Sequence, residues 1–565
     1  MVQDLSVQFS GIEQTPGVLP DEQGIIQVTV TNNGDMSLTD GSLNLYASSD
    51  SELDHNSLNS NDDYLEGTQV YALKGTNELL GTLSNIDLAA NESRSFTINF
   101  ADEQFHNPSV VSPGAYNLFA EIDPDNTVVE SDENNNQAIA FMSVEGTDAV
   151  LDWNSVLLNA VQTQGELDRE NGVQLTDYTV PGEAPPIEAR DAAILAIAQY
   201  EAISGINGDC GSSWDGSIIP LDGISAEAAA AGAGYQVLAT LFPEQTSTFN
   251  LQLEASLAEI NDDPTAENIG LSFGLAVANQ ILALRAGDGA DVAQVPYTPG
   301  SNPGEYNETN ENGTVSAALA NFGNVTPFVL ENVADFRPDG PPEYGSEEYI
   351  YETEQVRLFG GQTDTENTQL LRTEDQTEIA QFWAYDRQDT FRPPGQWVEI
   401  AQEVALDQGN TLEENALLFA QLNVALADAG IVAWDTKYTY DQQRPYNTIV
   451  QDQLEGVTAD PDWQPLLSTP PFPDYISGHA TFGGAAAAVL SDFFGDDISF
   501  EIASQELPGV TRTFTGSGDL NSFEAAALEN ANSRFYGGVH LESSNLDGLA
   551  TGQLVGDYVA DNFLA

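Results

Sequence analysis

Cysteine, histidine and basic residues are all scarce in this chain of 565 residues. The single cysteine, Cys210, excludes an intrachain disulfide framework and a thiolate metal cluster, because each needs more than one thiol, and we expect it to be inert. Only 14 Lys and Arg residues stand against 89 Asp and Glu residues, which gives a formal net charge of -75. Nucleic acids and anionic membranes attract basic surfaces, so we do not expect them as partners.

Long apolar runs and a recognisable leader are also missing. No uninterrupted stretch of about 18 apolar residues is present, and we therefore expect no membrane insertion. The first residues, MVQDLSVQFSG, lack the basic and apolar regions of a secretory signal. A strongly acidic surface nevertheless suits a salt-rich or extracellular medium, where ions screen self-repulsion. We predict an extracellular or cell-surface protein, exported after removal of a leader or by another route.

The first quarter of the chain is predicted to be β-structure within a multidomain protein of two or three domains. Up to residue 146, short runs such as IIQVTVTNN, GSLNLYASS and SRSFTINF alternate apolar and polar residues between Asn, Gly, Asp and Ser clusters. This pattern predicts an antiparallel β-sandwich. Its last part, AYNLFAEIDPDNTVVESDENNNQAIAFMSVEG, resembles the cell-adhesion-related bacterial (CARDB) domain.

The acidic turn in that last part has two interpretations. Carboxylates are good calcium ligands, so the turn could bind Ca²⁺. It lacks the ligand spacing of an EF-hand loop, however, and a solvated acidic turn is the alternative that we favour. The candidate ligands are Asp123, Asp125, Glu130, Asp132 and Glu133.

From residue 151 to residue 565 the apolar periodicity becomes that of helices. Ala- and Leu-rich segments place apolar residues at spacings of three and four and often end at Gly or Pro. They predict a mainly α-helical bundle. The loop-rich residues 297–372 are expected to cover one end of it. The helical segments are WNSVLLNAVQ, EARDAAILAIAQYEAI, SAEAAAAGAGYQVLATLF, NIGLSFGLAVANQILALRAG and ENALLFAQLNVALADAGIVAWDTKY.

Two of the four histidines, His55 and His106, fall in polar loops of the predicted sandwich, where surface histidines are ordinary. The helical part contains the other two and a pair of cations. Lys437 is followed after six residues by Arg444 and Pro445. In a chain with so few basic residues, this pair suggests a positive lining for an anion, although chance surface charge is an equal alternative.

Two further patterns contain the remaining histidines. Ser477, Gly478 and His479 open a small-residue helix, where a hydroxyl, backbone N–H groups and the helix dipole favour an oxyanion. In the other pattern, Arg534 precedes His540 by six positions, and its planar fork of donors also suits an oxyanion.

In order and spacing, the three patterns together resemble the signature shared by the type 2 phosphatidic acid phosphatases and the vanadium haloperoxidases: K-x6-RP, then P-S-G-H, then S-R-x5-H. Ile476 replaces the usual proline of the second motif. Upstream stretches such as PPIEARDAAILAIAQYEAI, FRPDGPP and RTEDQTEIAQFWAYD are similar to the soluble haloperoxidase branch. The membrane phosphatases of the superfamily lack these stretches. The resemblance covers most of residues 152–565 and favours a haloperoxidase.

The resemblance implies a vanadate cofactor and a role for each matched residue. His540 would bind the vanadium, and His479 would accept a proton from hydrogen peroxide. Lys437 would polarise the peroxide for attack by halide, which gives hypohalous acid and then modified small organic acceptors. Asp386 would orient one arginine from behind. The vanadate oxygens would be held by Lys437, Arg444, Ser477, the Gly478 N–H and Arg534.

Three residues would line the halide pocket in this interpretation. Trp434 and Phe472 would form an apolar wall, as in chloroperoxidases of the family. Gln443, however, replaces a tryptophan of related sequences and would make the pocket more polar, unless it points away. Since chloride is the most strongly hydrated and the hardest to oxidise of the three halides, we expect bromide and iodide oxidation with weaker chloride activity.

Two alternatives to a haloperoxidase remain open. Phosphate has the geometry of vanadate, so a soluble acid phosphatase would use the same residues, with His540 as nucleophile and His479 as general acid. The sandwich and the charge would also suit an adhesive or structural surface protein whose catalytic domain is inactive, although none of the motif residues is missing. Assembly into a homo-oligomer is compatible with each interpretation.

Overall fold

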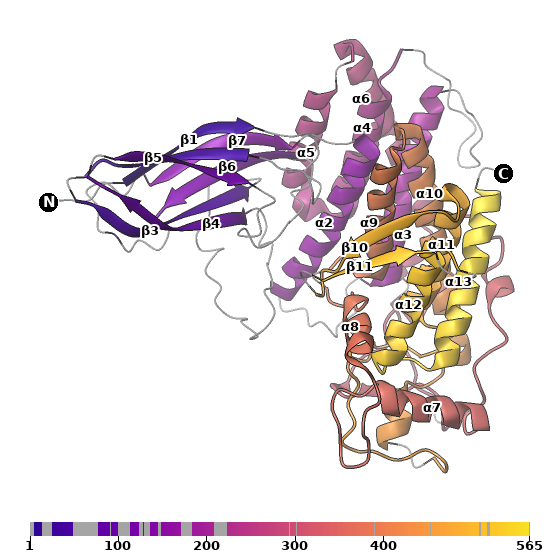
Figure 1. Ribbon diagram of the computed structural model, residues 1–565. Coiled ribbons are helices and arrows are strands. Elements are labelled where there is room, and N and C mark those ends of the chain that lie inside the picture. The colour runs from indigo at the N-terminus through magenta and orange to yellow at the C-terminus, as the bar shows by residue number, and fades with distance from the viewer. Residues whose placement is uncertain are drawn as a thin grey trace. The chain divides into compact units, whose positions relative to one another are not determined.

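The computed structural model forms two compact units, which are described separately (Figure 1). One unit comprises Met1–Val156 and Phe242–Glu267, and the other comprises Leu157–Leu241 and Asn268–Ala565. The boundary predicted between residues 146 and 151 stays a prediction. The structure describes residues 5–13, 25–34, 36–48, 77–90, 92–99, 114–123, 128, 136–144, 148–170, 184–207, 223–260, 262–292, 294–300, 302–388, 390–451, 454–507, 510–516 and 520–563.

The first unit contains two antiparallel sheets, with strand orders β1-β2-β5 and β4-β3-β6-β7. In β2, Val28 and Val30 are fully buried, while Thr29 points to the other face and bonds to Ser95 across the strand pair (2.8 Å). This alternation is the period-two pattern read from the sequence. The predicted antiparallel β-structure is confirmed. The strands are β1 (Leu5–Glu13), β2 (Ile25–Asn32), β3 (Leu38–Ser48), β4 (Asn77–Leu88), β5 (Ser93–Asn99), β6 (Gly114–Ile122) and β7 (Gln137–Val144).

The two sheets contact each other through β1, which touches β6 and β7. Helix α5 (Thr246–Glu259) also belongs to this unit and packs against β6. The sequence gives no local sign of this contribution, because α5 lies in the middle of the helical segments.

Calcium finds no support in the described part of this unit. The Asp123 carboxylate accepts a hydrogen bond from the Val128 N–H (2.7 Å), as in an ordinary turn. Among the described residues, no group of three or more His, Cys, Asp and Glu side chains is arranged to hold a metal ion. The other proposed ligands, Asp125, Glu130, Asp132 and Glu133, lie outside the described residues, as do Cys210, His55 and His106.

The second unit is mostly helical, as predicted, and its helices cover the segments with helical periodicity (Figure 1). Two short hairpins, β8-β9 and β10-β11, accompany the helices. The helices are α2 (Ala149–Glu170), α3 (Pro185–Asn207), α4 (Ala226–Leu241), α6 (Pro264–Arg285), α7 (Glu347–Phe359), α8 (Glu374–Phe382), α9 (Arg392–Gln408), α10 (Leu412–Tyr440), α11 (Gly478–Phe494), α12 (Ser522–Tyr536) and α13 (Glu542–Asn562). The first residues of α2 and of α6 fall in the other unit. The hairpin strands are β8 (Thr309–Asn310), β9 (Gly313–Thr314), β10 (Ser499–Ala503) and β11 (Thr511–Thr515).

Helix α10 is the core helix of this unit and contacts α3, α9, α11 and α13. By length and hydropathy it would qualify as a membrane span, but 94% of its most apolar window is buried inside the protein, as expected of a core helix. Its Asp428 accepts hydrogen bonds from the N–H groups of Phe328, Val329 and Leu330 (2.7–3.0 Å). These bonds tie the loop-rich residues 297–372 to the core.

Glycines let α11 and α13 pack in close contact. A Cβ atom at Gly484 would lie 2.2 Å from the Leu549 carbonyl oxygen, and one at Gly552 would lie 2.0 Å from the Thr481 carbonyl oxygen. No larger residue fits these positions. The Ser477 N–H therefore reaches the Ser544 carbonyl (3.0 Å), so the first turns of the two helices meet.

Helix α9 contains two carboxyl groups that oppose folding as the pH rises. Burial and the Glu403 charge raise the pKa of Glu399 to about 8, and burial raises the pKa of Glu403 to about 7. Below pH about 4.5 each carboxyl is protonated in both the folded and the unfolded chain. Above that pH the unfolded chain releases the proton first, so stability is lost as the pH rises toward 8.

We therefore expect Glu399→Gln to stabilise the protein at pH 8 and not at pH 4.5. The gain should be on the order of 1 kcal/mol, which is a few degrees in Tm. Thermal unfolding at both pH values measures it. Glu455→Gln, at an exposed position, controls for the general benefit of removing one negative charge. An equal gain at both pH values would contradict the expectation.

Candidate active site

The structure brings the three sequence patterns together inside the second unit. Lys437 lies in the last turn of α10, His479 in the first turn of α11, and His540 in the connection between α12 and α13. Arg444 Nη1 lies 3.0 Å from His540 Nε2. All of these side chains are buried, and the loop Phe472–Asp474 links them.

His540 is held as a neutral imidazole with its proton on Nδ1. Nδ1 is bonded to the Asp474 carboxylate and lies 3.0 Å from Ser544 Oγ. A carboxylate only accepts, and a guanidinium only donates, so Nδ1 carries the proton and Nε2 keeps its lone pair toward Arg444. Burial and the charge of Arg444 hold the pKa of His540 well below its usual range. A neutral imidazole with an unprotonated Nε2 is the form that binds a metal or attacks phosphorus.

Two buried arginines, Arg444 and Arg534, use only some of their guanidinium nitrogens in hydrogen bonds to the described residues. Arg444 donates to the Phe472 and Val539 carbonyls (both 2.8 Å), and Arg534 donates to the Asp386 carboxylate. Nη2 of Arg444 and both Nε and Nη1 of Arg534 are buried and have no hydrogen-bond partner among the described residues. Buried donors of this kind are costly unless a ligand accepts from them. Arg285 and Arg392 each have one buried Nε of the same kind, whereas three such nitrogens belong to the two arginines of the sequence motifs.

Lys437 adds a third buried positive charge. Its Nζ donates to the carbonyls of Pro473 (2.9 Å) and Asp474 (3.0 Å). Burial and the charge of Arg444 hold the pKa of Lys437 well below its usual range, and burial also lowers the pKa of Arg444. Since the cations disfavour each other's charged forms, the cluster is electrostatically complementary to an anion.

His479 and Asp386 lie on the Arg534 side of the site. Nε2 of His479 donates to the Ala384 carbonyl (2.8 Å), which leaves Nδ1 as the nitrogen that can accept a proton. Burial and the charge of Arg534 lower the pKa of His479 to about 3. Burial acts to raise the pKa of Asp386, but the charges of Arg534 and His479 outweigh it and hold that pKa below its usual value.

The N-terminus of α11 faces the same region. Ser477 is the N-cap, and its hydroxyl accepts from the Ala480 N–H (3.5 Å). The first N–H groups of a helix, here beginning with Gly478, have no acceptor within the helix. A Cβ at Gly478 would lie 3.5 Å from the Trp434 ring, so this turn runs directly past that aromatic wall.

The predicted halide-pocket residues separate into two groups. The Trp434 and Phe472 rings pack with centroids 5.0 Å apart, and Lys437 Nζ lies 4.8 Å from the Phe472 centroid. Gln443, in contrast, donates its side-chain amide to Thr448 (2.6 Å), whose hydroxyl is bonded to Tyr349 (2.7 Å). The aromatic pair thus lies beside the cations, while the Gln443 amide nitrogen is engaged by Thr448.

Sequence reasoning missed Asp474 and Ser544. Asp474 is fully buried, and burial raises its pKa to about 6. Its second oxygen accepts from the Leu541 N–H (3.2 Å), and its carbonyl accepts from Ser544 Oγ (3.1 Å). An acidic residue within the apolar stretch PPFPDYI was the available signal, because a buried carboxylate needs partners.

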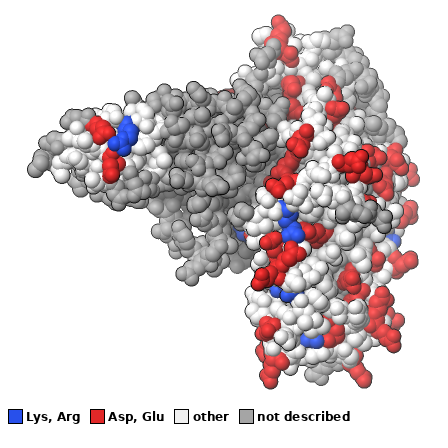
Figure 2. All heavy atoms as spheres, viewed as in Figure 1, with Lys and Arg blue, Asp and Glu red and all other residues white. Residues whose placement is uncertain are grey.

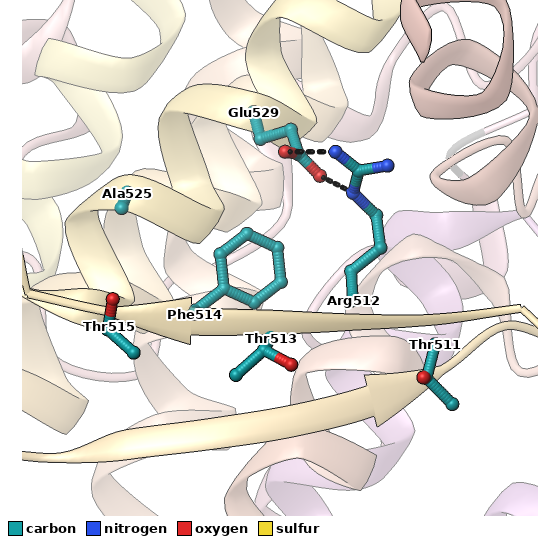
Figure 3. A pocket seen from close by; sticks show the side chains of 7 residues that line it. All are labelled: Thr511, Arg512, Thr513, Phe514, Thr515, Ala525 and Glu529. Carbon is teal, nitrogen blue, oxygen red and sulfur yellow. Dashed lines mark hydrogen bonds and ion pairs between the residues drawn. The ribbon is translucent and has the colours of Figure 1, made fainter.

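A pocket between β11 and α12 contains an arginine, Arg512, whose charge is compensated by carboxylates (Figure 3). Arg512 forms ion pairs with Glu529 (2.7 Å), Glu378 (2.8 Å) and Asp375 (3.4 Å). Figure 3 shows the Glu529 carboxylate facing the guanidinium across the pocket. Arg512 therefore carries no uncompensated positive charge in this pocket, and the buried cluster is the candidate anion site.

Comparisons with known proteins identify relatives of both parts of the chain. Residues 417–564 match the family model described as the VCPO second helical-bundle domain, and residues 2–140 match CARDB. The vanadium chloroperoxidase of Curvularia inaequalis is 26% identical over 508 residues, which span 70% of this chain and 78% of that protein. A solved bacterial vanadium-dependent iodoperoxidase is also 26% identical, with a TM-score of 0.61 over 74% of this chain and 98% of its own.

The helical unit is homologous to the vanadium haloperoxidases. A bacterial vanadium-dependent chloroperoxidase structure shares the fold at 15% identity, with a TM-score of 0.50 over 68% of this chain and 94% of its own. The haloperoxidase family match spans most of α10 and all of α11, α12 and α13. The predicted resemblance to this family, and that of the N-terminal part to CARDB, are both confirmed.

Proposed function

We propose that this haloperoxidase homologue is a vanadate-dependent enzyme that oxidises halide with hydrogen peroxide to hypohalous acid. The observation that carries the proposal is a set of three buried guanidinium nitrogens that have no hydrogen-bond partner among the described residues. They belong to Arg444 and Arg534, and they accompany a neutral histidine whose unprotonated Nε2 lies 3.0 Å from Arg444 Nη1. An oxyanion accepts from such donors, and a metal oxyanion also takes the imidazole nitrogen as a ligand. The donor set therefore fits vanadate.

Each residue has a definite task in this proposal. His540 would ligate vanadium through Nε2, and Arg444, Arg534 and Lys437 would hold the oxygens together with the Ser477 hydroxyl and the Gly478 N–H. Vanadate, when bound, would act as a Lewis acid that activates peroxide for two-electron oxidation of halide. The anion's charge would offset that of Arg534 and raise the low pKa of His479, so Nδ1 becomes able to accept the proton released by hydrogen peroxide.

The proposal is tested by oxidation of bromide in metal-stripped protein. We expect turnover only when both vanadate and hydrogen peroxide are present. The matched control is Arg512→Lys, which changes an arginine that is already ion-paired outside the site and should leave turnover unchanged. Turnover that is independent of vanadate would remove the basis of the proposal.

Halide preference is a separate prediction, because the similar proteins named above differ in the halide of their names. We expect bromide and iodide to be oxidised faster than chloride. Trp434 and Phe472 offer an apolar wall, but buried Lys437 beside Phe472 leaves a pocket that is not uniformly apolar, and chloride loses most from incomplete desolvation. Steady-state rates with each halide at fixed peroxide and vanadate measure this. Chloride turnover equal to that of bromide would contradict it.

An acid phosphatase remains the second candidate, supported by the same His540. A neutral imidazole with a carboxylate behind Nδ1 is also suited to attack phosphorus. We expect the vanadate-free protein to hydrolyse an activated phosphate ester slowly, with vanadate as a competitive inhibitor, because both oxyanions would fill one site. Initial rates at several vanadate concentrations test this. Hydrolysis that vanadate does not inhibit would exclude a shared site.

The N-terminal CARDB unit and the acidic surface are both compatible with an extracellular location. We propose an extracellular or cell-surface location, with the CARDB unit serving attachment or contacts between copies of the chain. Figure 2 shows Asp and Glu side chains spread over the visible face of the helical part, with few Lys and Arg among them.

A further inference from the structure

We propose that Asp474 is the positioning residue that makes His540 a ligand, by fixing its tautomer and the direction of its ring. The inference rests on the proposed function, since it concerns how the chain prepares Nε2 for a metal oxyanion. Asp474 is 0% exposed and belongs to the loop before α11, 66 positions from His540 in the sequence. It is not part of any of the three motifs.

Both oxygens of the Asp474 carboxylate accept hydrogen bonds. Oδ1 accepts the Nδ1 proton of His540, and Oδ2 accepts the Leu541 N–H (3.2 Å). The imidazole and the peptide that follows it are therefore held by one rigid group. With Nδ1 protonated, the only lone pair of the ring is on Nε2, which is directed to the Arg444 side of the site. Carboxylates placed behind ligating histidines act in this way in metal sites.

The backbone around Asp474 also positions the cations. The Phe472 carbonyl accepts from Arg444 Nε (2.8 Å), and the Pro473 and Asp474 carbonyls accept from Lys437 Nζ. The Asp474 N–H in turn donates to the Gln442 carbonyl (2.9 Å). The loop Phe472–Asp474 therefore connects His540, Arg444 and Lys437. Its carbonyls bind the two cations, and the Asp474 side chain accepts the hydrogen bond from His540.

Asp474→Asn tests the proposal at constant size. The amide has a single acceptor atom, so it can serve His540 Nδ1–H or Leu541 N–H, but not both. If its oxygen turns to Leu541, its NH₂ donates to Nδ1 and the histidine must move its proton to Nε2. If its oxygen turns to His540, its NH₂ opposes the Leu541 N–H and the turn must shift. Either outcome spoils the alignment of the Nε2 lone pair.

The first measurement is vanadate binding to metal-stripped protein by equilibrium dialysis, without any assay of turnover. We expect Asp474→Asn to weaken vanadate binding by roughly 10–100-fold, as is usual for such partners of metal ligands. The matched control is Asp428→Asn, which replaces another fully buried carboxylate that accepts backbone N–H groups away from His540. The control should lose stability and keep vanadate affinity. Equal affinity in Asp474→Asn and the wild type would overturn the proposal.

The second measurement reads the tautomer directly in the wild type, and so does not depend on how a variant folds. The chain has four histidines, so ¹⁵N NMR of histidine-labelled, metal-free protein can resolve His540, assigned by its loss in His540→Ala. We expect a neutral ring with the proton on Nδ1. A proton on Nε2 would contradict the proposal. Because neither measurement involves halide, a protein that binds vanadate as expected but oxidises no halide would count against the proposed function alone.

Discussion

Replacing His540 by alanine is expected to abolish tight vanadate binding, whereas replacing His479 by alanine should leave vanadate bound and remove turnover. The difference follows from what each nitrogen contacts. Nε2 of His540 is unprotonated and lies beside Arg444 Nη1, so its loss removes the proposed metal ligand. Nε2 of His479 is used by the Ala384 carbonyl, and only Nδ1 is left for proton transfer. Proton acceptors of this kind contribute about 10²–10⁴-fold to the rate.

Equilibrium dialysis and bromide oxidation, measured on the same preparations, separate the two effects. The vanadate affinity of His540→Ala should fall by more than about 100-fold, beyond the loss expected for a residue that only supports the ligand. His479→Ala should keep most of the affinity because the arginines and Lys437 remain. Equal vanadate retention in the two variants would show that the assigned roles are wrong.

Raising the salt concentration is expected to stabilise the protein strongly. The net charge of -75 makes the folded chain repel itself, and the acidic side chains are spread over the visible face of the helical part (Figure 2). The Debye length falls from about 30 Å at 0.01 M to about 3 Å at 1 M salt, which removes most of the repulsion. We expect Tm to rise by at least about 5 °C, or on the order of 2 kcal/mol.

Thermal unfolding in NaCl, KCl and sucrose tests the cause of this effect. Screening predicts similar increases in Tm in NaCl and KCl at equal ionic strength. Sucrose is uncharged and cannot screen, so any increase in Tm that it causes comes from its exclusion from the protein surface. A Tm that stays constant between low and high salt would contradict the electrostatic account.

The sequence was sufficient for elements whose signal is local. Alternating runs identified the strands, and spacings of three and four identified helices such as α10 and α11. Site residues inside the short motifs, such as Lys437 and His479, could be named because the chain has so few cations and histidines. Asp386 was also named, and the structure brings it to Arg534.

Features that depend on distant contacts could not be read in this way. Asp474 meets His540 across 66 positions, and nothing in the periodicity of either segment indicates that pairing. The place of α5 in the first unit depends on its packing against β6, which is also remote in sequence. Gln443 illustrates a third limit to sequence reasoning: its identity was known, but its hydrogen bond to Thr448 is set by tertiary packing.

The most direct test of the central claim is to measure bromide oxidation against the amount of vanadium bound per chain. Metal-stripped protein is titrated with vanadate, and bound vanadium and turnover are determined on the same samples, with His540→Ala alongside. We predict that turnover rises in proportion to bound vanadium and reaches its maximum when bound vanadium and protein are equimolar. His540→Ala should show no turnover. Turnover that does not follow bound vanadium, or that persists in His540→Ala, would contradict the assignment of a vanadate site at His540.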